Sequence, residues 1–118
     1  MRNLKVMSLV ILLAVSFGLV YATAASVLTR FNIEPNPMEK ATTIYLSFSK
    51  EVNVDISVET LDGEIVKTVY SGRLNAGDYE YAWDRSDNMG EYVIKGTYNL
   101  VVNYGLRYTS TKKTLILK

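Results

Sequence analysis

The chain has 118 residues, of which 13 are basic and 12 acidic, and it contains neither histidine nor cysteine. These two absences exclude a Ser-His-Asp triad, a Cys-His catalytic pair, an ordinary zinc site, disulfide staples and iron–sulfur ligation. An apolar share of 48%, with two prolines and seven glycines, fits one ordinary globular domain. We therefore expect a protein that is not an enzyme and that holds no cofactor.

The first residues have the pattern of an export signal. Arg2 and Lys5 precede the uncharged and mostly aliphatic run Val6–Val20, and Ala22 and Ala24 then supply the small residues that signal peptidase reads. The run is shorter than the roughly 20 residues that a membrane-spanning helix needs. We expect a helical signal peptide that is cleaved after the second of these alanines, with an uncleaved N-terminal anchor as the alternative.

Cleavage at that point divides the chain into a signal peptide, residues 1–24, and an exported domain, residues 25–118. The domain then carries 11 basic and 12 acidic residues, a net charge of −1. Its longest run of like charge is Lys112-Lys113, so no surface for nucleic acid or for anionic lipid is indicated. An exported domain without disulfides is typical of bacteria, and we expect a periplasmic, cell-surface or secreted location.

Alternation with a period of two predicts β-strands throughout the domain. The clearest example is the segment from residue 52 to 58, where four aliphatic side chains point one way and three polar ones the other. Asp62-Gly63 predicts a hairpin turn, and Ser71-Gly72 and Asn75–Gly77 bracket a predicted loop. In chain order the expected strands are Leu28–Ile33, Thr42–Phe48, Val52–Val58, Ile65–Tyr70, Asp78–Trp83, Tyr92–Ile94, Thr97–Tyr104 and Thr111–Lys118.

These seven or eight short strands, with turn signals about every 8–12 residues, indicate an all-β domain. The spacing favours an immunoglobulin-like antiparallel β-sandwich. An up-and-down barrel is the alternative, although so short a chain would barely close one around a ligand.

Several short motifs follow one another in a characteristic order. They are Phe31, Pro35-Asn36-Pro37, Gly63, Gly77, Trp83-Asp84, Gly90, Val93, Gly96-Thr97-Tyr98 and the last strand, Lys113–Lys118. Together they resemble the immunoglobulin-like domain of the bacterial flagellar hook-capping protein, which is similar to sorting domains of type IX secretion. The sequence departs from this family at Arg85, where glycine is common. The resemblance implies a structural or assembly module, here free-standing behind its leader.

The motif residues also have a physical interpretation of their own. Trp83 ends an alternating strand and is expected between the two sheets, and Asp84 is expected to accept backbone N–H groups as an Asx-turn. Gly96 fits a place where the backbone needs positive φ or close approach. The two prolines prevent ladder pairing after the first strand, as at an edge or a crossover.

Two sets of side chains are candidate sites. The oxygen-bearing residues Asp84, Asp87, Asn88 and Glu91 lie within one loop and form a weak candidate for calcium, with a solvated turn as the favoured interpretation. Tyr45 is expected on the outer face of its strand, where a tyrosine can anchor a protein interface. Four other tyrosines are expected in the core: Tyr79, Tyr81, Tyr98 and Tyr104.

Two functions remain open on this sequence. The first is a non-catalytic structural or assembly module that binds protein partners of the envelope, or of a surface appendage, through a sheet face or edge. The second is an envelope or secreted module that binds glycan or calcium.

Overall fold

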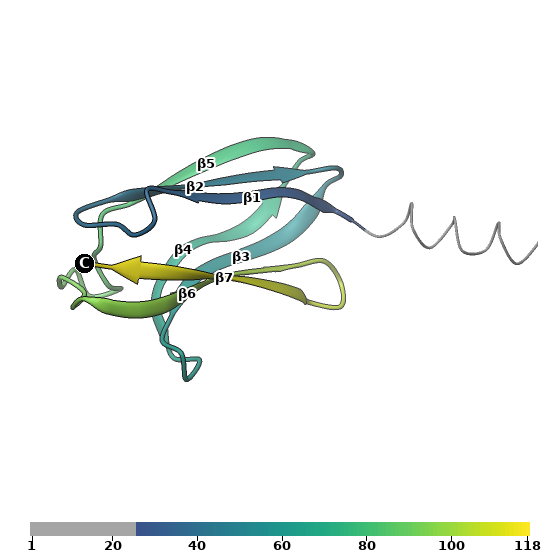
Figure 1. Ribbon diagram of the computed structural model, residues 1–118. Coiled ribbons are helices and arrows are strands. Elements are labelled where there is room, and N and C mark those ends of the chain that lie inside the picture. The colour runs from purple at the N-terminus through teal and green to yellow at the C-terminus, as the bar shows by residue number, and fades with distance from the viewer. Residues whose placement is uncertain (1–25) are drawn as a thin grey trace, which may run out of the picture.

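The computed structural model describes residues 26–118, all of which belong to one sandwich of strands and loops (Figure 1). The expected signal peptide, its helix and its cleavage after Ala24 lie outside the described residues. Within 26–118 there is no helix of the length and apolarity that crossing a membrane requires.

Seven antiparallel strands form two facing sheets, with β1, β2 and β5 in one layer and β3, β4, β6 and β7 in the other (Figure 1). The smaller sheet has the order β1-β2-β5 and the larger one β4-β3-β6-β7. The all-β sandwich expected from the sequence is confirmed. The strands are Leu28–Glu34 (β1), Thr42–Phe48 (β2), Val52–Glu59 (β3), Ile65–Leu74 (β4), Gly77–Trp83 (β5), Gly96–Tyr104 (β6) and Thr109–Leu117 (β7).

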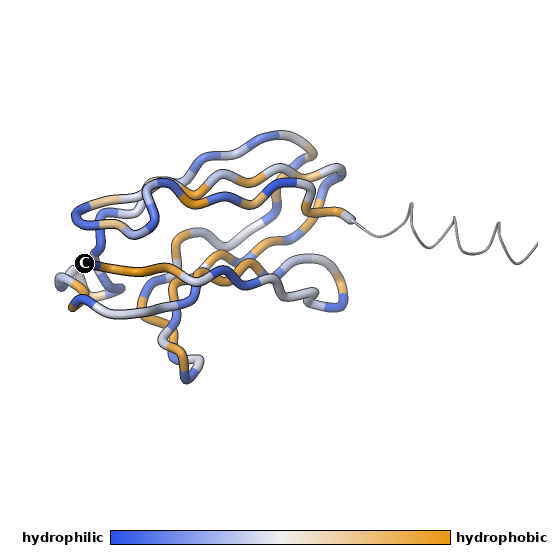
Figure 2. Tube along the Cα trace, viewed as in Figure 1, coloured by the Kyte–Doolittle hydropathy of each residue, from blue (hydrophilic) through white to orange (hydrophobic). Residues whose placement is uncertain are grey.

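The period-two pattern determines which side chains enter the core. In β2 every second residue is buried, and in β3 the four aliphatic side chains of residues 52, 54, 56 and 58 are all at most 6% exposed. Hydrophobic and hydrophilic residues accordingly alternate along β1 and β2 in Figure 2. Burial of one aliphatic side chain contributes about 1.5–3 kcal/mol, so this alternation supplies most of the force that joins the sheets.

Two of the expected segments are wrong. Ser71-Gly72 does not leave the sheet, because β4 continues to Leu74 and Gly72 pairs with Val54. The missing side chain leaves room for the hydroxyl of Tyr70, which would lie only 2.8 Å from a Cβ at Gly72. The short strand expected over Tyr92–Ile94 is also absent, because that segment forms one isolated bridge, from Tyr92 to Ser86, and no ladder.

The expectation for the tyrosines is correct for one of four. Tyr98 is 8% exposed, whereas Tyr79, Tyr81 and Tyr104 are half-buried and pack against the margin of the core. The difference arises because Tyr79 and Tyr81 lie on β5, the last strand of the smaller sheet, where no further strand covers them.

Candidate functional site

The Pro-Asn-Pro segment ties the smaller sheet to the last strand of the larger one. The Asn36 amide donates a hydrogen bond of 2.8 Å to the carbonyl of Thr114 and accepts one of 3.0 Å from the N–H of Ile116. The next residues continue this contact, because Met38 forms a parallel bridge with Leu117. The segment connects β1 to β2 within the smaller sheet and is therefore no crossover, but Asn36 occupies part of the free edge of β7 in the other sheet.

Trp83 lies in the core and its indole is hydrogen-bonded. The side chain is 2% exposed, and its Nε1–H donates to the carbonyl of Ser86 at 2.8 Å. Asp84 Oδ1 accepts from the N–H of Ser86 at 3.1 Å, which is the Asx-turn geometry. Hydrogen bonds from the hydroxyl and the N–H of Ser86 lower the pKa of the Asp84 carboxyl. Both side chains therefore stabilise the turn after β5.

Arg85, the position at which the sequence departs from the family pattern, is a buried polar residue. It is only 3% exposed, and its guanidinium donates to three carbonyls, of Val93 at 2.8 Å, Glu39 at 2.6 Å and Lys118 at 2.7 Å. The ring of Tyr92 lies 4.5 Å from the guanidinium carbon. One side chain thus joins the loop after β1, the loop after β5 and the C-terminal residue.

The backbone of Arg85 has φ of 68°, in the left-handed region where glycine is the natural residue. The family pattern, with glycine common at this position, fits this conformation. Arginine at a position where the family often has glycine is the one feature of the sequence that distinguishes this position from the family pattern. It exchanges a small conformational cost for three charge-assisted hydrogen bonds.

The residues of the weak calcium candidate direct side-chain oxygens to backbone N–H groups. Asp87 Oδ1 accepts the backbone N–H groups of Met89 and Glu91, both at 2.8 Å, and Asn88 Oδ1 accepts the N–H of Thr68 at 3.0 Å. Within residues 26–118, no three acidic groups lie where they would share a cation. The oxygens of this loop hold the loop itself and fasten it to the free edge of β4.

Tyr45 lies on the outer face of the β1-β2-β5 sheet. Its neighbours across the strands are Asn32 and Glu80, and the guanidinium carbon of Arg30 lies 5.1 Å from its ring centre. Its ring is half-buried by these neighbours. The outer residues of β5 at positions 78 and 80 are both acidic and exposed, so this side of the face is negative.

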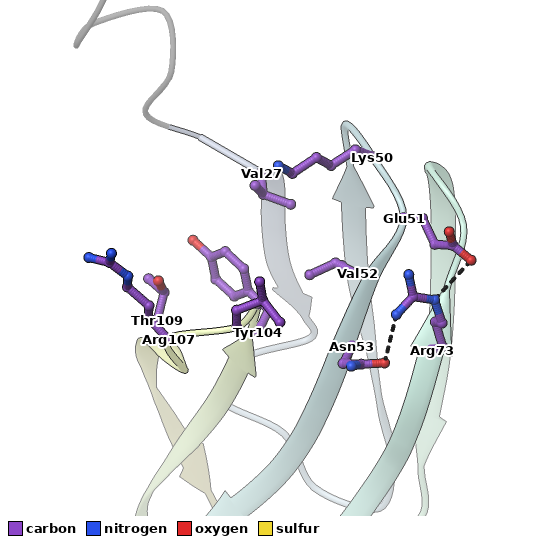
Figure 3. A pocket seen from close by; sticks show the side chains of 11 residues that line it. Val27, Lys50, Glu51, Val52, Asn53, Arg73, Tyr104, Arg107 and Thr109 are labelled. Atoms are coloured by element: carbon purple, nitrogen blue, oxygen red, sulfur yellow. Dashed lines mark hydrogen bonds and ion pairs between the residues drawn. The ribbon is translucent and has the colours of Figure 1, made fainter.

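A groove of about 450 Å³ lies at the end of the sandwich where β1 begins (Figure 3). Val27, Val52 and Tyr104 form its apolar part; in Figure 3 the Lys50 amine extends toward Val27, whereas the Arg107 guanidinium points away from the other lining side chains. The other residues that line it are Glu51, Asn53, Arg73, Gly105, Leu106 and Thr109.

An ion pair occupies one wall of this groove. Arg73 Nε lies 2.9 Å from Glu51 Oε2, and Arg73 also donates to the amide oxygen of Asn53 at 3.4 Å. The hydrogen bond and the charge of Arg73 lower the pKa of the Glu51 carboxyl. Both partners are more than half exposed, so the pair orders the wall but adds little to stability.

A second hollow, of about 340 Å³, adjoins the groove on the outer face of β3 and β4. Tyr108 donates to Asp55 Oδ2 at 2.9 Å, and Ser71 donates to the other oxygen of the same carboxylate. The hydrogen bond from Tyr108 to Asp55, together with the charge of Asp55, raises the pKa of the Tyr108 phenol. The hollow thus combines a largely exposed aromatic ring with hydroxyl and carboxylate groups.

The comparison with known proteins supports the fold that these contacts hold together. The family model of the FlgD Ig-like domain matches residues 30–106. FlgD from P. aeruginosa has 20% identity and a TM-score of 0.51, and the similarity covers 78% of this chain and 77% of FlgD. Latent dimeric PorU from Porphyromonas gingivalis has 18% identity and a TM-score of 0.60 over 74% of this chain, but only 9% of PorU. Among curated proteins, none matches this sequence significantly.

Proposed function

Because the chain belongs to the family of FlgD Ig-like domains, the family that its motifs resemble, we propose that it is a non-catalytic assembly module outside the cytoplasm. It binds a protein partner of the envelope, or of a surface appendage, through the β1-β2-β5 sheet. This sheet carries Tyr45 on its face and a free edge at β5.

The observation that carries this proposal is that the motif side chains form hydrogen bonds with the backbone of the domain. Asn36, Trp83, Asp84 and Arg85 all direct their polar atoms to backbone groups of the sandwich itself. A catalytic site needs polar groups that converge on a substrate, and these converge on the chain instead. Their role is to hold a rigid scaffold, whose surfaces then remain for binding.

The proposal is tested on the tagged full chain, produced at its native level in the host and extracted under mild conditions. We expect a complex of fixed size that contains one additional protein. Tyr45→Ala should weaken this complex while the domain stays folded, with a loss of stability under about 1 kcal/mol, whereas Leu61→Ala, at an exposed turn position of the other sheet, should leave the complex intact. A chain that migrates alone under all conditions would contradict the proposal.

A glycan-binding function is the second candidate, and the hollow beside Tyr108 is the observation that favours it. An exposed aromatic ring next to hydroxyl and carboxylate groups is suited to stacking and hydrogen bonding with a sugar. Calorimetry with soluble glycans, and with calcium as the remaining alternative, separates the two functions. Heat of binding to a glycan that Tyr108→Ala abolishes would favour this second candidate.

A further inference from the structure

The two sheets of the sandwich have unequal widths, three strands against four. They are aligned at the β1 and β7 side, where Lys113 lies 5.4 Å from the ring of Phe31 and where Met38 bridges Leu117. The missing strand of the smaller sheet therefore falls at its other margin, beside β5. The larger sheet extends past β5 with its own outermost strand, β4.

Burial along β4 agrees with this overhang. No residue of β4 before Leu74 is buried, whereas every inward residue of the neighbouring strand β3 is. The inward ring of Tyr70 on β4 is half-buried and meets Tyr81 of β5 at a ring-centre distance of 5.2 Å. The ring of Tyr79 lies nearly parallel to that of Tyr81 at a ring-centre distance of 6.5 Å. Three half-buried tyrosine rings thus form the margin of the core at the vacant position.

The other sheet margins are closed or blunted. The edge of β7 is occupied by Asn36 and Met38, and the edge of β4 is bonded to Asn88 through Val66 and Thr68. The edge strand β1 has a register shift near its beginning and stops before Pro35. Bulges and prolines of this kind are devices that prevent a strand from being added to an edge.

The β5 edge has none of these features. Gly77–Trp83 pairs with β2 over seven residues without a register shift and contains neither proline nor lysine. Within residues 26–118, no hydrogen bond from another segment reaches its free side. Every second residue of such a strand presents its N–H and C=O outward, ready to pair with another chain.

We propose that the β5 edge accepts an extended segment of the partner protein as a fourth strand, and that this segment alternates basic and apolar residues. Its outward side chains lie beside Asp78 and Glu80, which selects Lys or Arg. Its inward side chains pack on Tyr70, Tyr79 and Tyr81, which selects apolar residues. The main-chain ladder supplies affinity and the alternation supplies specificity.

A second copy of this chain is a poor occupant of the same edge. Pairing β5 with β5 would place Asp78 and Glu80 of one copy beside the same acidic side chains of the other. Like charges opposite each other across a strand pair are destabilising. The inference rests on the proposed protein-binding function, and it names the surface and the chemistry of the segment that is bound.

The probe is the acetylated and amidated peptide Val-Lys-Val-Lys-Val-Lys-Val, titrated into the purified exported protein at low salt. We expect saturable binding, and protection from hydrogen exchange at amides of β5 that exchange freely without peptide. Glu80→Lys should weaken binding by about five- to tenfold, because it replaces an attractive cross-strand pair with a repulsive one. Glu34→Lys makes the same charge change at the far end of β1 and should alter affinity less than about twofold.

Two further peptides complete the test. The peptide with glutamate in place of lysine should bind more weakly to the natural chain and better to Glu80→Lys. The peptide with proline at its centre should not bind, because proline cannot donate to the ladder.

Equal binding of the proline peptide, equal loss in Glu34→Lys and Glu80→Lys, or protection outside β5 would each overturn the inference. So would a concentration-dependent dimer that Glu80→Lys abolishes, because the occupant would then be a second copy. If the peptide does not bind at β5 but the native complex still depends on Tyr45, the proposed protein-binding function is supported and only the strand addition is contradicted.

Discussion

Replacement of Arg85 is the sharpest test of how the sandwich is held together. The side chain is 3% exposed and donates three hydrogen bonds, all of 2.8 Å or less, to carbonyls of three separate segments. Hydrogen bonds that involve a charged group contribute about 1.5–3 kcal/mol each and are not additive. We expect Arg85→Ala to lower the free energy of unfolding by about 3–5 kcal/mol. A domain of this size has about 5–14 kcal/mol in total.

Arg85→Gly separates the hydrogen bonds from the backbone strain. It loses the same three bonds but relaxes the left-handed φ of 68°, which a side chain adopts at a cost of about 1–2 kcal/mol. Arg85→Gly should therefore be more stable than Arg85→Ala by about 1 kcal/mol, and both should be less stable than the natural chain. Arg30→Ala is the control, because Arg30 is exposed and makes only a cation–π contact; its loss should stay below about 1 kcal/mol.

Urea denaturation followed by the fluorescence of Trp83 measures all three variants. In a thermal melt, each kcal/mol lost should lower the Tm by about 4–8 °C. A loss below about 1 kcal/mol for Arg85→Ala, or an Arg85→Gly variant more stable than the natural chain, would refute the argument. The hydrogen bonds of Arg85 would then contribute little to stability, and the side chain would not be what holds the three segments together.

Three further outcomes follow from the same contacts. Trp83→Ala should cost about 3–5 kcal/mol, because it removes the largest side chain of the core, whereas Tyr45→Ala on the outer face should cost under about 1 kcal/mol; similar losses would mean that the faces are misassigned. Asn36→Ala should increase hydrogen exchange at β7 amides near the C-terminus first, and uniform change throughout the sandwich would contradict the proposed tie. Burial raises the pKa of Tyr81 above its ordinary value of 10.0, so its protonated phenol stabilises the fold below that pH, and this stabilisation is lost as pH rises through the folded pKa. Tyr81→Phe should reduce that alkaline loss in pH-dependent melts, and an unchanged pH profile would show that the phenol is not responsible.

The limits of a strand were predictable where alternating apolar and polar residues distinguish its buried face from its exposed face. Thr42–Phe48 has the same limits in the sequence and in the structure, because β2 is central and its two faces are consistently different. The limits of β4 were missed because it is an edge strand that contains a glycine, and Ser71-Gly72 has the local pattern of a loop although Gly72 pairs with Val54 in the sheet. Local pattern therefore determined the central strands better than this edge strand.

The contacts of Arg85 and Asn36 were not predictable, because their partners lie far along the chain. Arg85 reaches carbonyls 46 and 33 residues away, and Asn36 reaches β7 across 78 residues. A single sequence carries no periodic signal for such pairs. The sequence marked both positions through its motifs, while only the folded chain shows what they bind.

Site-specific photo-crosslinking in the native host tests the central claim, protein binding by the β1-β2-β5 sheet, most directly. A photoreactive amino acid would replace Tyr45, Glu80 or, as the control, the exposed Leu61 of the β3–β4 turn. The account predicts a crosslink to the same single protein from Tyr45 and Glu80 and none from Leu61. No protein adduct at the first two positions, or the same adducts at all three, would contradict it.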